Sequence, residues 1–500
     1  MNRVAVVVGG GISGLVTALR LIEGARTRGI PLTVRLFEAS GRIGGVIGTV
    51  TRDGFLLEQG PDSLITNKPA GTALCAELGL GERLVGTLGA HRRSFVVGGG
   101  KLHPVPEGFY LLAPTAIAPF IASNLFSWMG KLRMGLDLVL PARRDTADET
   151  LASFVRRRLG QEALERIAQP MIAGIYTADP EKLSLAATMP QFLELERKYG
   201  SVIRGMIATG MGGARKDGTA GPRYGLFATL TGGLEELVTA VASRLTPGTV
   251  TLGARVRGLT RTAAGWELEA GGERIRADVV CIALPPPRTA EVVGALDSEL
   301  GAALGGIPCS SAATVNLGYR AADVPHPLDG MGLVIPAQER TTMMACSFSS
   351  RKFVNRSPDG MVLLRAFVGG AMHTASYALD DAAMVDGVRR DLGQLLGIRA
   401  APVLTLVSRH DEAMPQYLLG HLDRVATIER RLDGLPGLAL AGNGYRGVAI
   451  PDCAASADRA ANRLLDALAA QAPDSGLRTP DWSPSPGDLR SGPALSPTGS

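Results

Sequence analysis

Three glycines near the N-terminus have the spacing of a site that binds a nucleotide diphosphate. Residues 4–21, VAVVVGGGISGLVTALRL, run from β-branched residues through Gly9, Gly11 and Gly14 into apolar residues at helical spacing. This order of strand, glycine turn and helix lets a pyrophosphate approach the backbone, and the helix N-terminus attracts its negative charge. A hydrophobic strand and helix joined by a plain glycine turn would give a similar pattern, so the next strand decides between the two.

An acidic residue and a second pair of glycines follow at the end of that next strand. The segment PLTVRLFEAS is a predicted strand ending near Glu38, whose carboxylate can accept hydrogen bonds from the hydroxyls of an adenosine ribose. The chain then continues through Arg42, Gly44 and Gly45. A nicotinamide dinucleotide needs no second glycine pair here. The diphosphate and ribityl chain of FAD need such a pair, together with a cation such as the Arg42 guanidinium. The sequence therefore favours FAD as the cofactor.

The composition limits the class of protein and its partners. A chain of 500 residues, 45% hydrophobic and 20% charged, is expected to form two or three globular domains. The formal charge of +5 comes from scattered arginines rather than a basic block, so nucleic acid is not an expected partner. The five cysteines lack metal-binding or redox spacing, which indicates reduced, structural thiols. No secretory signal is evident, and we expect a cytoplasmic protein.

An apolar stretch over residues 108–144 has two interpretations. It is interrupted by Pro114 and Pro119 and bordered by lysine and arginine, and no run of 18 apolar residues occurs, so a transmembrane helix is not predicted. We expect helices that cover a hydrophobic cavity. The alternative is a peripheral surface patch that touches the inner face of the cell membrane. The last thirty residues are rich in Pro, Ser and Gly and are expected to be disordered.

The predicted elements return to the nucleotide-binding sheet several times along the chain. Residues 150–200 are predicted as helices and residues 312–370 as strands. The segment RADVVCIALPPP is predicted as a central strand of the nucleotide domain, resumed after a long insertion. Residues 437–468 repeat the strand, glycine turn and helix of the N-terminus. Both ends of the chain are therefore expected to hold one flavin.

The chain resembles the oxygen-dependent protoporphyrinogen and coproporphyrinogen oxidases of the bacterial type, within the FAD-dependent amine oxidase superfamily. The resemblance covers about residues 1–468 and rests on GGGISGL, EASGRIGG, LEQGPDSL, KLHPVPEG, LFSWMGKLRM, AGIYTADPEKLSL, TLTGGL, MPQY and GNGYRGVAIPDC. It implies an α/β fold: a Rossmann-like FAD-binding domain of the GR2 type built from discontinuous segments, a mixed α+β substrate domain and a helical insertion. The implied FAD-binding segments are 1–90, 224–300 and 408–468; the substrate segments 91–103, 196–223 and 301–407; the helical insertion 104–195; and the disordered tail 469–500.

The resemblance also implies which residues hold FAD. Val256 would meet the adenine through its backbone, and the last helix would direct its dipole at the flavin. Core packing is the alternative role for Val256 and Ile450. The implied FAD-binding residues are Gly9, Gly10, Gly11, Ile12, Ser13, Gly14, Glu38, Arg42, Gly45, Val46, Gly60, Pro61, Val256, Gly442, Val448, Ala449 and Ile450.

The substrate implied by the resemblance is a porphyrinogen, either protoporphyrinogen IX or coproporphyrinogen III. This large apolar macrocycle with propionate tails needs a roomy apolar cavity with few cations at its rim. Met331 stands where many family members carry an aromatic residue, and Ser94 where many carry arginine. The implied wall is formed by Met171, Ile172, Gly174, Ile175, Met331 and Val334, and the candidate propionate partners are Arg92 and Arg93, with Lys101 near the same mouth.

The implied reaction belongs to haem biosynthesis. A hydride passes from a bridging methylene carbon to FAD, molecular oxygen reoxidises the flavin with release of hydrogen peroxide, and the cycle repeats until the ring is aromatic. No residue is assigned as catalytic, and no metal site is expected. The six histidines are expected to be structural, although His410 and Tyr417 lie near the cavity. A homodimer and a hand-off of the product to a ferrochelatase are further expectations.

Two other functions stay open. An FAD-dependent amine oxidase or desaturase would use the same frame, but an amine oxidase usually sets an aromatic pair before the flavin. The C-terminal loop offers Tyr445 alone. A flavin-fold protein without activity, kept as a membrane-binding or partner-binding module, would be expected to have damaged cofactor loops. Here every glycine expected near FAD is present.

Overall fold

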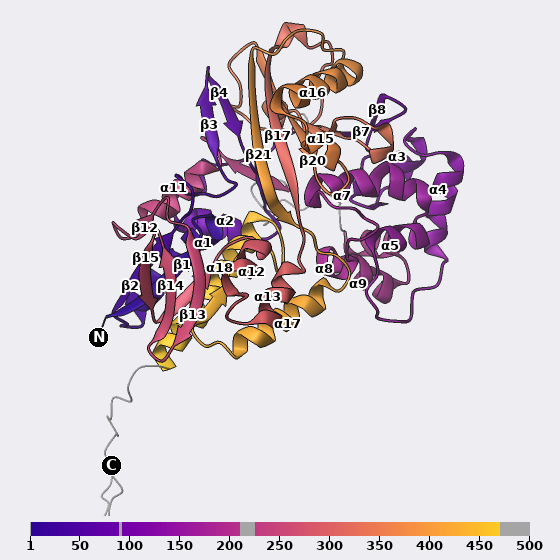
Figure 1. Cartoon of the computed structure of the whole chain (residues 1–500). Coiled ribbons are helices and arrows are strands. Elements are labelled where there is room, and N and C mark those ends of the chain that lie inside the picture. Colours follow the sequence, from indigo (N-terminus) through magenta and orange to yellow (C-terminus); the bar gives the residue numbers. More distant parts are fainter. Residues whose placement is uncertain (1, 90–92, 211–225, 471–500) are drawn as a thin grey trace, which may run out of the picture.

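The computed structural model of the chain describes residues 2–89, 93–210 and 226–470. Figure 1 shows three parts: a parallel sheet with its helices near the N-terminus, a larger sheet above it, and a group of helices beside both. The expected disordered tail lies outside the described residues, apart from its first two positions, which belong to the last helix.

The nucleotide-binding sheet is parallel and is assembled from distant parts of the chain. Its strand order is β12-β2-β1-β16-β22. The register places Val8 between Phe37 and Ile282, so the strands end together beside the first glycine loop. The strands are β1 (Arg3–Val8), β2 (Leu32–Phe37), β12 (Val250–Thr251), β16 (Val279–Ile282) and β22 (Leu438–Leu440). The expected discontinuous domain, with RADVVCIALPPP as a central strand, is therefore confirmed.

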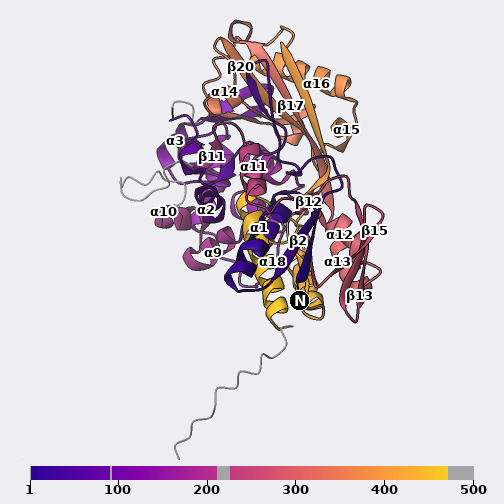
Figure 2. The same ribbon diagram turned by 90° about the vertical axis from the view of Figure 1, so that its left-hand side faces the viewer.

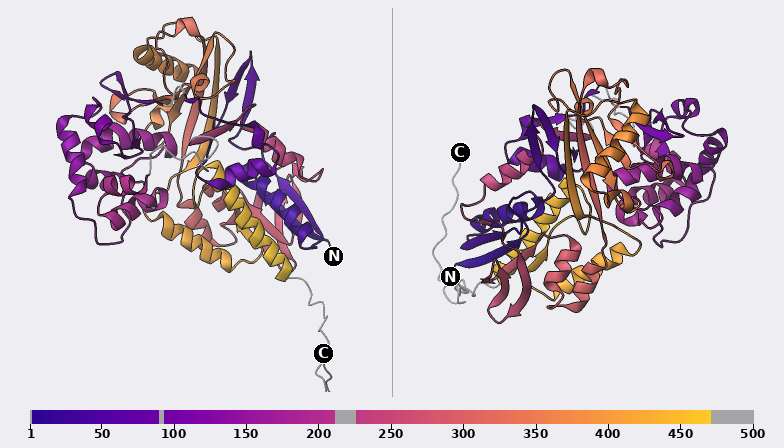
Figure 3. Two further views of the ribbon diagram at one scale, coloured as in Figure 1. Left: turned by 180° about the vertical axis from the view of Figure 1, so that it is seen from behind. Right: turned by 45° about the horizontal axis from the view of Figure 1, so that its top comes forward.

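Two helices from opposite ends of the chain cover one face of this sheet. They are α1 (Ile12–Thr27) and α18 (Ile450–Ala470), which lie side by side in Figures 2 and 3. A Cβ on Gly24 of α1 would overlap Leu465 of α18, so the helices touch at a residue without a side chain. Their apolar faces form one core with β1 and β16. This packing brings the N-terminal and C-terminal glycine turns to the same edge of the sheet.

The other face of the parallel sheet is covered by a second layer. An antiparallel sheet packs there around Trp266, which is almost fully buried. The elements of this layer are β13 (Val256–Thr262), β14 (Gly265–Ala270), β15 (Glu273–Ala277), α12 (Pro286–Val293), α13 (Ser298–Gly305) and α17 (His421–Asp433).

The larger sheet has seven strands in the order β21-β17-β20-β19-β18-β7-β8, all antiparallel except the β18–β7 pair. Helix α16 (Asp381–Leu396) covers one face through Met384, Val388 and Leu392. In Figure 1 the long strands β17 and β21 run from the top of the molecule toward the parallel sheet. The strands are β7 (Ser94–Gly98), β8 (Lys101–Pro104), β17 (Cys309–Arg320), β18 (Gly332–Val334), β19 (Met343–Ser347), β20 (Met361–Gly369) and β21 (Leu404–Pro415).

Smaller elements join the two large sheets. They include the hairpin β3 (Thr49–Arg52) and β4 (Phe55–Glu58), the sheet of β5 (Leu64–Ile65), β6 (Leu84–Gly86) and β11 (Phe227–Leu230), the pair β9 (Phe109–Tyr110) and β10 (Ala113–Pro114), and the helices α2 (Pro69–Glu77), α11 (Glu235–Ser243), α14 (Ser349–Lys352) and α15 (Thr374–Tyr377). Short turns of 3-10 helix lie at η1 (Gly81–Arg83), η5 (Ala321–Asp323) and η6 (Ala337–Glu339).

The helical insertion packs around a separate apolar core. It contains α3 (Ile117–Ala122), α4 (Trp128–Gly135), η3 (Leu136–Leu138), α5 (Leu151–Arg158), α6 (Gln161–Ala163), the π-helix η4 (Leu164–Ala168), α7 (Gln169–Tyr176), α8 (Leu185–Thr188), α9 (Pro190–Tyr199) and α10 (Val202–Thr209). The helices continue past residue 195, where we expected the insertion to end, because Val202, Ile203 and Met206 of α10 belong to the same core.

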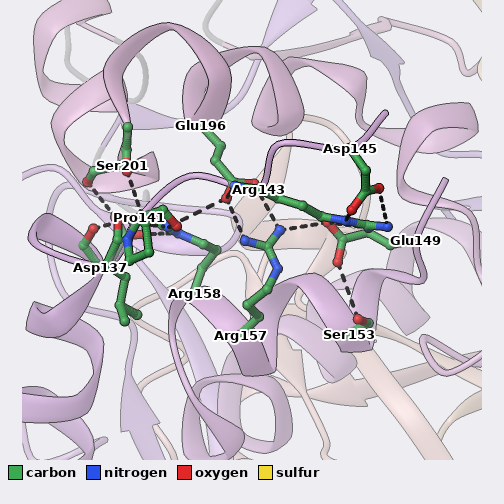
Figure 4. A network of polar contacts seen from close by, with 12 residues as sticks. Asp137, Pro141, Arg143, Asp145, Glu149, Ser153, Arg157, Arg158, Glu196 and Ser201 are labelled. Atoms are coloured by element: carbon green, nitrogen blue, oxygen red, sulfur yellow. Dashed lines mark hydrogen bonds and ion pairs between the residues drawn. The ribbon is translucent and has the colours of Figure 1, made fainter. Parts of the chain in front are cut away.

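A buried network of charges fixes the insertion internally, as Figure 4 shows. Arg158 and Asp137 are both fully buried, and Arg158 Nε donates to Asp137 Oδ1 at 2.5 Å. Asp137 also accepts from the backbone N–H of Ile203 at 2.9 Å, near the start of α10. Glu196 of α9 accepts from Arg157 at 2.5 Å. Burying these charges is tolerable only because each has a partner, so the network ties η3 rigidly to α5, α9 and α10.

Candidate functional site

The first glycine loop leaves open space where a pyrophosphate would lie. Gly9 has a φ of +105°, which disfavours any residue with a side chain, and a Cβ on Gly14 would overlap the Gly9 carbonyl oxygen. Gly9 and Gly14 are therefore required by the fold itself. Gly11 differs, because the nearest atom to an added Cβ is the Cα of Gly45, at 4.0 Å. The fold itself therefore does not require glycine at position 11, whereas a ligand bound close to this backbone would require it.

Helix α1 offers its N-terminus to an anion. Gly11 is the N-cap residue, no side chain caps the helix, and no acidic residue occurs in its first turn. The backbone N–H groups of the first turn, which include those of Ile12 and Ser13, thus keep their partial positive charge for a ligand. This helix N-terminus without a side-chain cap fits the diphosphate of FAD.

Glu38 and Arg42 both bind the glycine loops. Glu38 lies just after β2, and its Oε2 accepts from the Gly10 N–H at 2.6 Å. Arg42 donates to the Ile47 carbonyl at 2.8 Å and also to that of Gly45. The Gly44 N–H donates to the Gly10 carbonyl at 2.8 Å, so the two glycine loops touch directly. Glu38, Arg42 and the two glycine loops therefore lie together, as predicted. A contact of Arg42 with phosphate stays a prediction.

The chain just before Val256 lies beside Glu38. The Ala254 N–H donates to the Glu38 carbonyl at 2.9 Å, and the β13–β14 pair contains a bulge between Arg257 and Leu259. Val256 is itself buried in the core between the two layers, as its alternative role required. Its backbone follows Ala254 by two residues, and its contact with adenine stays a prediction.

Gly60 and Pro61 lie directly on the second glycine loop. A Cβ on Gly60 would overlap the Val46 carbonyl oxygen, so the two backbones are in close contact. Two side chains of the large sheet hold the carbonyl of the preceding residue, Gln59. Thr314 Oγ1 donates to it at 2.8 Å, and His410 Nε2 lies 2.8 Å from it. Burial lowers the pKa of His410, so the ring is neutral at pH 7 and its role is to hold the segment.

Polar residues of the large sheet, which no sequence motif predicted, hold the segment that leads to Gly60. Asn316 Nδ2 donates to the Glu58 carbonyl at 3.0 Å, and Arg365 Nη2 donates to the Gly60 carbonyl. Both side chains are buried, Asn316 in β17 and Arg365 in β20, which is otherwise apolar. A charged or amide residue inside such a strand was the available signal, since buried polar groups need partners.

The carboxylate of Glu58 joins the β3–β4 hairpin to the loop before α11. Its Oε2 accepts from Thr49 Oγ1 at 2.8 Å and its Oε1 from the Leu234 N–H at 2.9 Å. Burial raises the pKa of Glu58 to about 7, although these two hydrogen bonds oppose the shift. A substantial share of Glu58 is therefore protonated at neutral pH.

The C-terminal glycine loop ends at the start of α18. Gly442 has a φ of +139°, and an added Cβ there would meet nothing within 4 Å, so open space lies beside it. Tyr417 holds the loop: its hydroxyl donates to the Asn443 carbonyl at 2.6 Å and accepts from the Gly447 N–H at 2.8 Å. Tyr417 was expected to lie near the cavity. In the structure its hydroxyl positions the C-terminal glycine loop.

Tyr445 points away from the loop's open side. It is buried in the core beneath the parallel sheet, and its carbonyl lies 2.9 Å from His421 Nε2. Ile450, the first residue of α18, is likewise buried, in the core that α18 shares with α1, as its alternative role required. The side chain of Tyr445 is thus packed in a core with residues of the second layer.

The predicted substrate wall forms along one face of α7. Met171, Gly174 and Ile175 share this face, and Gly174 and Ile175 are exposed. A Cβ on Gly174 would lie 3.9 Å from Val334 of β18. Ile172 is a correction: it is fully buried in the insertion core, because a one-residue step from Met171 turns it about 100° around the helix.

The end of α7 and the C-terminal glycine loop are linked through Gln416 and Tyr417. Met171, Val334 and Val448 are all partly buried and pack against the same apolar cluster. The end of α7 is fixed to the large sheet, since Gln416 Nε2 donates to the Tyr176 carbonyl at 3.0 Å. Tyr417, the next residue after Gln416, donates to the Asn443 carbonyl at 2.6 Å, so neighbouring residues hold the end of α7 and the C-terminal glycine loop.

The candidate cations at the rim are only partly described. Arg92 lies outside the described residues. Arg93 is exposed and forms an ion pair with Asp329 at 3.0 Å, while its carbonyl accepts from the Met331 N–H at 2.8 Å. The position of Met331 beside Arg93 is thus fixed by its backbone, and its contact with substrate stays a prediction. Lys101 lies on β8, next to β7, with its side chain exposed.

The remaining groups that could bind a metal or react as thiols are histidines, cysteines and carboxylates. No group of three or more histidine, cysteine or carboxylate side chains within it is arranged to hold a metal ion. All five cysteines are free thiols, and four of them are buried. Burial raises the pKa of Cys281 to about 12, so this thiol stays protonated.

Comparison with known proteins agrees with the cofactor site. Residues 12–465 match the model of the flavin containing amine oxidoreductase family. Coproporphyrinogen III oxidase of Bacillus subtilis (strain 168) is 37% identical over 452 residues, which cover 90% of this chain and 95% of that protein. Protoporphyrinogen oxidase of Bos taurus is 31% identical over 493 residues, which cover 93% and 99%.

Solved structures show the same fold. A crystal structure from Exiguobacterium sp. 255-15, assigned as a protoporphyrinogen oxidase, aligns with a TM-score of 0.82 at 30% identity and covers 93% of this chain and 99% of that chain. Cyclohexylamine oxidase from Brevibacterium oxydans IH-35A aligns with a TM-score of 0.67 at 16% identity, over 94% and 100% of the chains. At that identity the second likeness concerns the fold alone.

Proposed function

The chain belongs to the flavin-containing amine oxidoreductase family and is an FAD-dependent oxidoreductase, and we propose that it oxidises a porphyrinogen to the porphyrin in haem biosynthesis. The observation that carries the proposal is the apolar face of Met171, Gly174 and Val334, beside a helix end that Gln416 and Tyr417 link to the C-terminal glycine loop. A wall of this kind suits a large apolar ring. The names of the relatives, coproporphyrinogen III oxidase and protoporphyrinogen oxidase, support the same substrate class.

The residues of the chain orient the reactants and exclude water. Bound FAD would supply a hydride acceptor for the bridging methylene carbon of the substrate, with molecular oxygen as the final acceptor and hydrogen peroxide as its product. The glycine loops and the N-terminus of α1 hold the diphosphate, and Glu38 holds the adenosine ribose. The wall of α7 and β18 places the macrocycle beside the C-terminal loop, and the exposed guanidinium of Arg93 binds a propionate at the rim. Orientation alone is sufficient, because the cofactor performs the chemistry.

Filling the wall tests this arrangement. A Gly174→Leu substitution adds a side chain that begins 3.9 Å from Val334, so it narrows the cavity without a clash in the folded protein. We expect at least a tenfold loss of kcat/KM with each porphyrinogen and an unchanged FAD content. A matched control is Gly135→Leu, at a helical glycine with nothing within 4 Å of an added Cβ. Equal kcat/KM values in wild type and Gly174→Leu would place the substrate elsewhere.

We also propose that the protein touches a membrane surface through its insertion. Among the described helices, none is long and apolar enough to cross a membrane. Trp128, Met129 and Val139 are nevertheless 73%, 74% and 77% exposed, next to the exposed Leu132. Apolar side chains gathered in this way favour contact with lipid.

Lipid vesicles test this contact. The double variant Trp128→Ser with Met129→Ser should lose binding in a flotation assay, whereas Val403→Ser, which alters an exposed valine on the large sheet side of the molecule, should keep it. Wild-type protein that stays unbound would refute the contact. The cytoplasmic location, the homodimer and the hand-off of product to a ferrochelatase stay predictions.

A further inference from the structure

A cluster of buried charges lies beneath the segment Gly60–Ser63. Its cations are Lys352, Arg356 and Arg365, and its carboxylates are Glu58 and Asp62. Arg356, Arg365 and Glu58 are each 2–3% exposed. The reaction proposed above assigns no role to these groups, and charges are rarely buried in such number without one.

Arg365 is the centre of this cluster. It projects from β20, and its Nη2 donates to the Gly60 carbonyl while its Nη1 lies 3.7 Å from Asp62 Oδ2. Its guanidinium carbon lies 4.7 Å from the centroid of the Phe367 ring. Within the described part of the chain its Nε has no hydrogen-bond partner. Arg365 therefore holds the Gly60 backbone while its own charge is only partly compensated.

Lys352 shares the same carboxylate. Its Nζ lies 2.9 Å from both oxygens of Asp62 and 3.4 Å from Ser63 Oγ. Burial alone would raise the pKa of Asp62, but the charges of Lys352 and Arg365 hold it below its ordinary value. Asp62 is thus fully ionised and is the one carboxylate that both cations share.

The cluster carries an excess of positive charge. Arg356 donates to the Leu230 carbonyl at 3.0 Å and to Thr229 Oγ1 at 3.0 Å, so its nearest partners are neutral. The carboxyl of Glu58, with a pKa near 7, is only partly ionised at neutral pH. The three cations therefore outnumber Asp62 and Glu58, and Glu236, which also acts on Arg356, forms an ion pair with Arg83. In a poorly solvated site such an excess acts on a neighbouring ligand more strongly than at a surface.

The segment above the cluster runs between the two loops that hold the cofactor. At one end Gly60 is packed on Val46, which follows the glycine pair at the first loop. A few residues later, Lys68 Nζ lies 2.8 Å from Asp452 in the first turn of α18, and a Cβ on Gly71 would lie 2.8 Å from Pro451. A flavin that extends from the first loop to the start of α18 must pass along this segment.

We propose that Arg365 is a positioning residue that fixes the Gly60–Ser63 segment and, with Lys352 and Asp62, supplies a buried positive charge that favours the reduced, anionic form of FAD. Two-electron reduction with one proton leaves a negative charge on the flavin ring, and a buried cation nearby stabilises that charge. The proposal rests on the cofactor and not on the identity of the substrate.

Reductive titration of FAD-loaded protein tests this proposal without any substrate. Under anaerobic conditions, with dithionite and a reference dye, Arg365→Met should shift the equilibrium toward oxidised FAD at least tenfold, which corresponds to about 30 mV for two electrons. Asp62→Asn should shift the equilibrium in the opposite direction, because it removes the negative charge. Arg365→Lys should keep most of the wild-type potential but bind FAD several-fold more weakly, because one ammonium group cannot replace the planar fork.

Two further variants make the outcome decisive. Arg409→Met removes a partly exposed cation on β21 that binds Asp381 and the Tyr377 carbonyl, and it should leave the potential unchanged. If Arg365→Met does not fold, Lys352→Met removes one charge from the same cluster and should shift the equilibrium in the same direction. A potential equal to wild type in the folded Arg365→Met or Lys352→Met protein would overturn the proposal. So would an equal shift in Arg365→Lys and Arg365→Met.

Discussion

Replacing Gly11 with valine should remove FAD from a protein that otherwise folds normally. The backbone of Gly11 has φ −69° and ψ 175°, an extended conformation that any residue adopts. The nearest atom to an added Cβ is the Cα of Gly45 at 4.0 Å. The free energy of unfolding of the apoprotein should therefore change by only about 0.5 kcal/mol. The added methyl groups would, however, occupy the space over the first turn of α1.

The expected loss of affinity follows from the contacts that valine prevents. A hydrogen bond from a backbone N–H to a charged phosphate is worth about 1.5–3 kcal/mol. Displacing the diphosphate from two such groups would cost about 3–6 kcal/mol, or roughly a 100-fold to 10,000-fold rise in the Kd for FAD. The flavin absorbance of the purified protein and an FAD titration of the apoprotein measure this rise. Chemical denaturation of the apoprotein measures its stability.

Two variants separate cofactor binding from folding. Gly135→Val alters a glycine that also has nothing near an added Cβ, and it should keep its FAD. Gly14→Val should fail to fold, because the Gly9 carbonyl occupies the place of its Cβ. A folded Gly11→Val protein with wild-type FAD content would refute the position assigned to the diphosphate.

Three further predictions concern single side chains. Glu38→Ala should weaken FAD by about 1–3 kcal/mol in the same titration, because it removes the acceptor for the ribose and for the Gly10 N–H; unchanged affinity would assign Glu38 to the surface. The pKa of Glu58 rises from about 4.5 to about 7 on folding, so the folded state keeps a proton that the unfolded chain has lost. Its contribution to the free energy of unfolding should therefore fall by about 2–4 kcal/mol as the pH rises through this range, and denaturation at several pH values should show that Glu58→Gln abolishes this fall. Arg93→Ala should raise KM for a porphyrinogen several-fold with little change in kcat, and by more for coproporphyrinogen if a propionate binds there; steady-state kinetics with an unchanged KM for both substrates would place Arg93 outside the site.

Local patterns predicted the cofactor loops well. The glycine spacing, Glu38 and the second glycine pair all lie within 42 residues of one another, and each is determined by its own neighbours in the chain. The structure brings the Glu38 carboxylate to the Gly10 N–H, and its contact with an adenosine ribose stays a prediction. Such local motifs can be read because the ligand is bound by backbone and by residues close in sequence.

The same patterns could not predict the residues that support these loops. Arg365 binds the Gly60 carbonyl across 305 positions of sequence, and nothing local predicts that pairing. Ile172 was wrongly assigned to the wall because the motif was carried over as a block, whereas the helical turn directs it into the insertion core. Contacts made by distant strands depend on the register of the sheet, which periodicity alone does not determine.

Porphyrin formation by the FAD-loaded protein is the most direct test of the proposed function. Protoporphyrinogen IX, coproporphyrinogen III and a primary amine, each prepared anaerobically and mixed with oxygenated enzyme, are followed by porphyrin fluorescence and hydrogen peroxide release. Removing six hydrogens from the macrocycle requires three two-electron oxidations. We therefore expect at least one porphyrinogen to yield porphyrin with three equivalents of peroxide, and the amine to yield none. Peroxide from the amine, with no porphyrin formed from either porphyrinogen above the rate without enzyme, would contradict the proposed function.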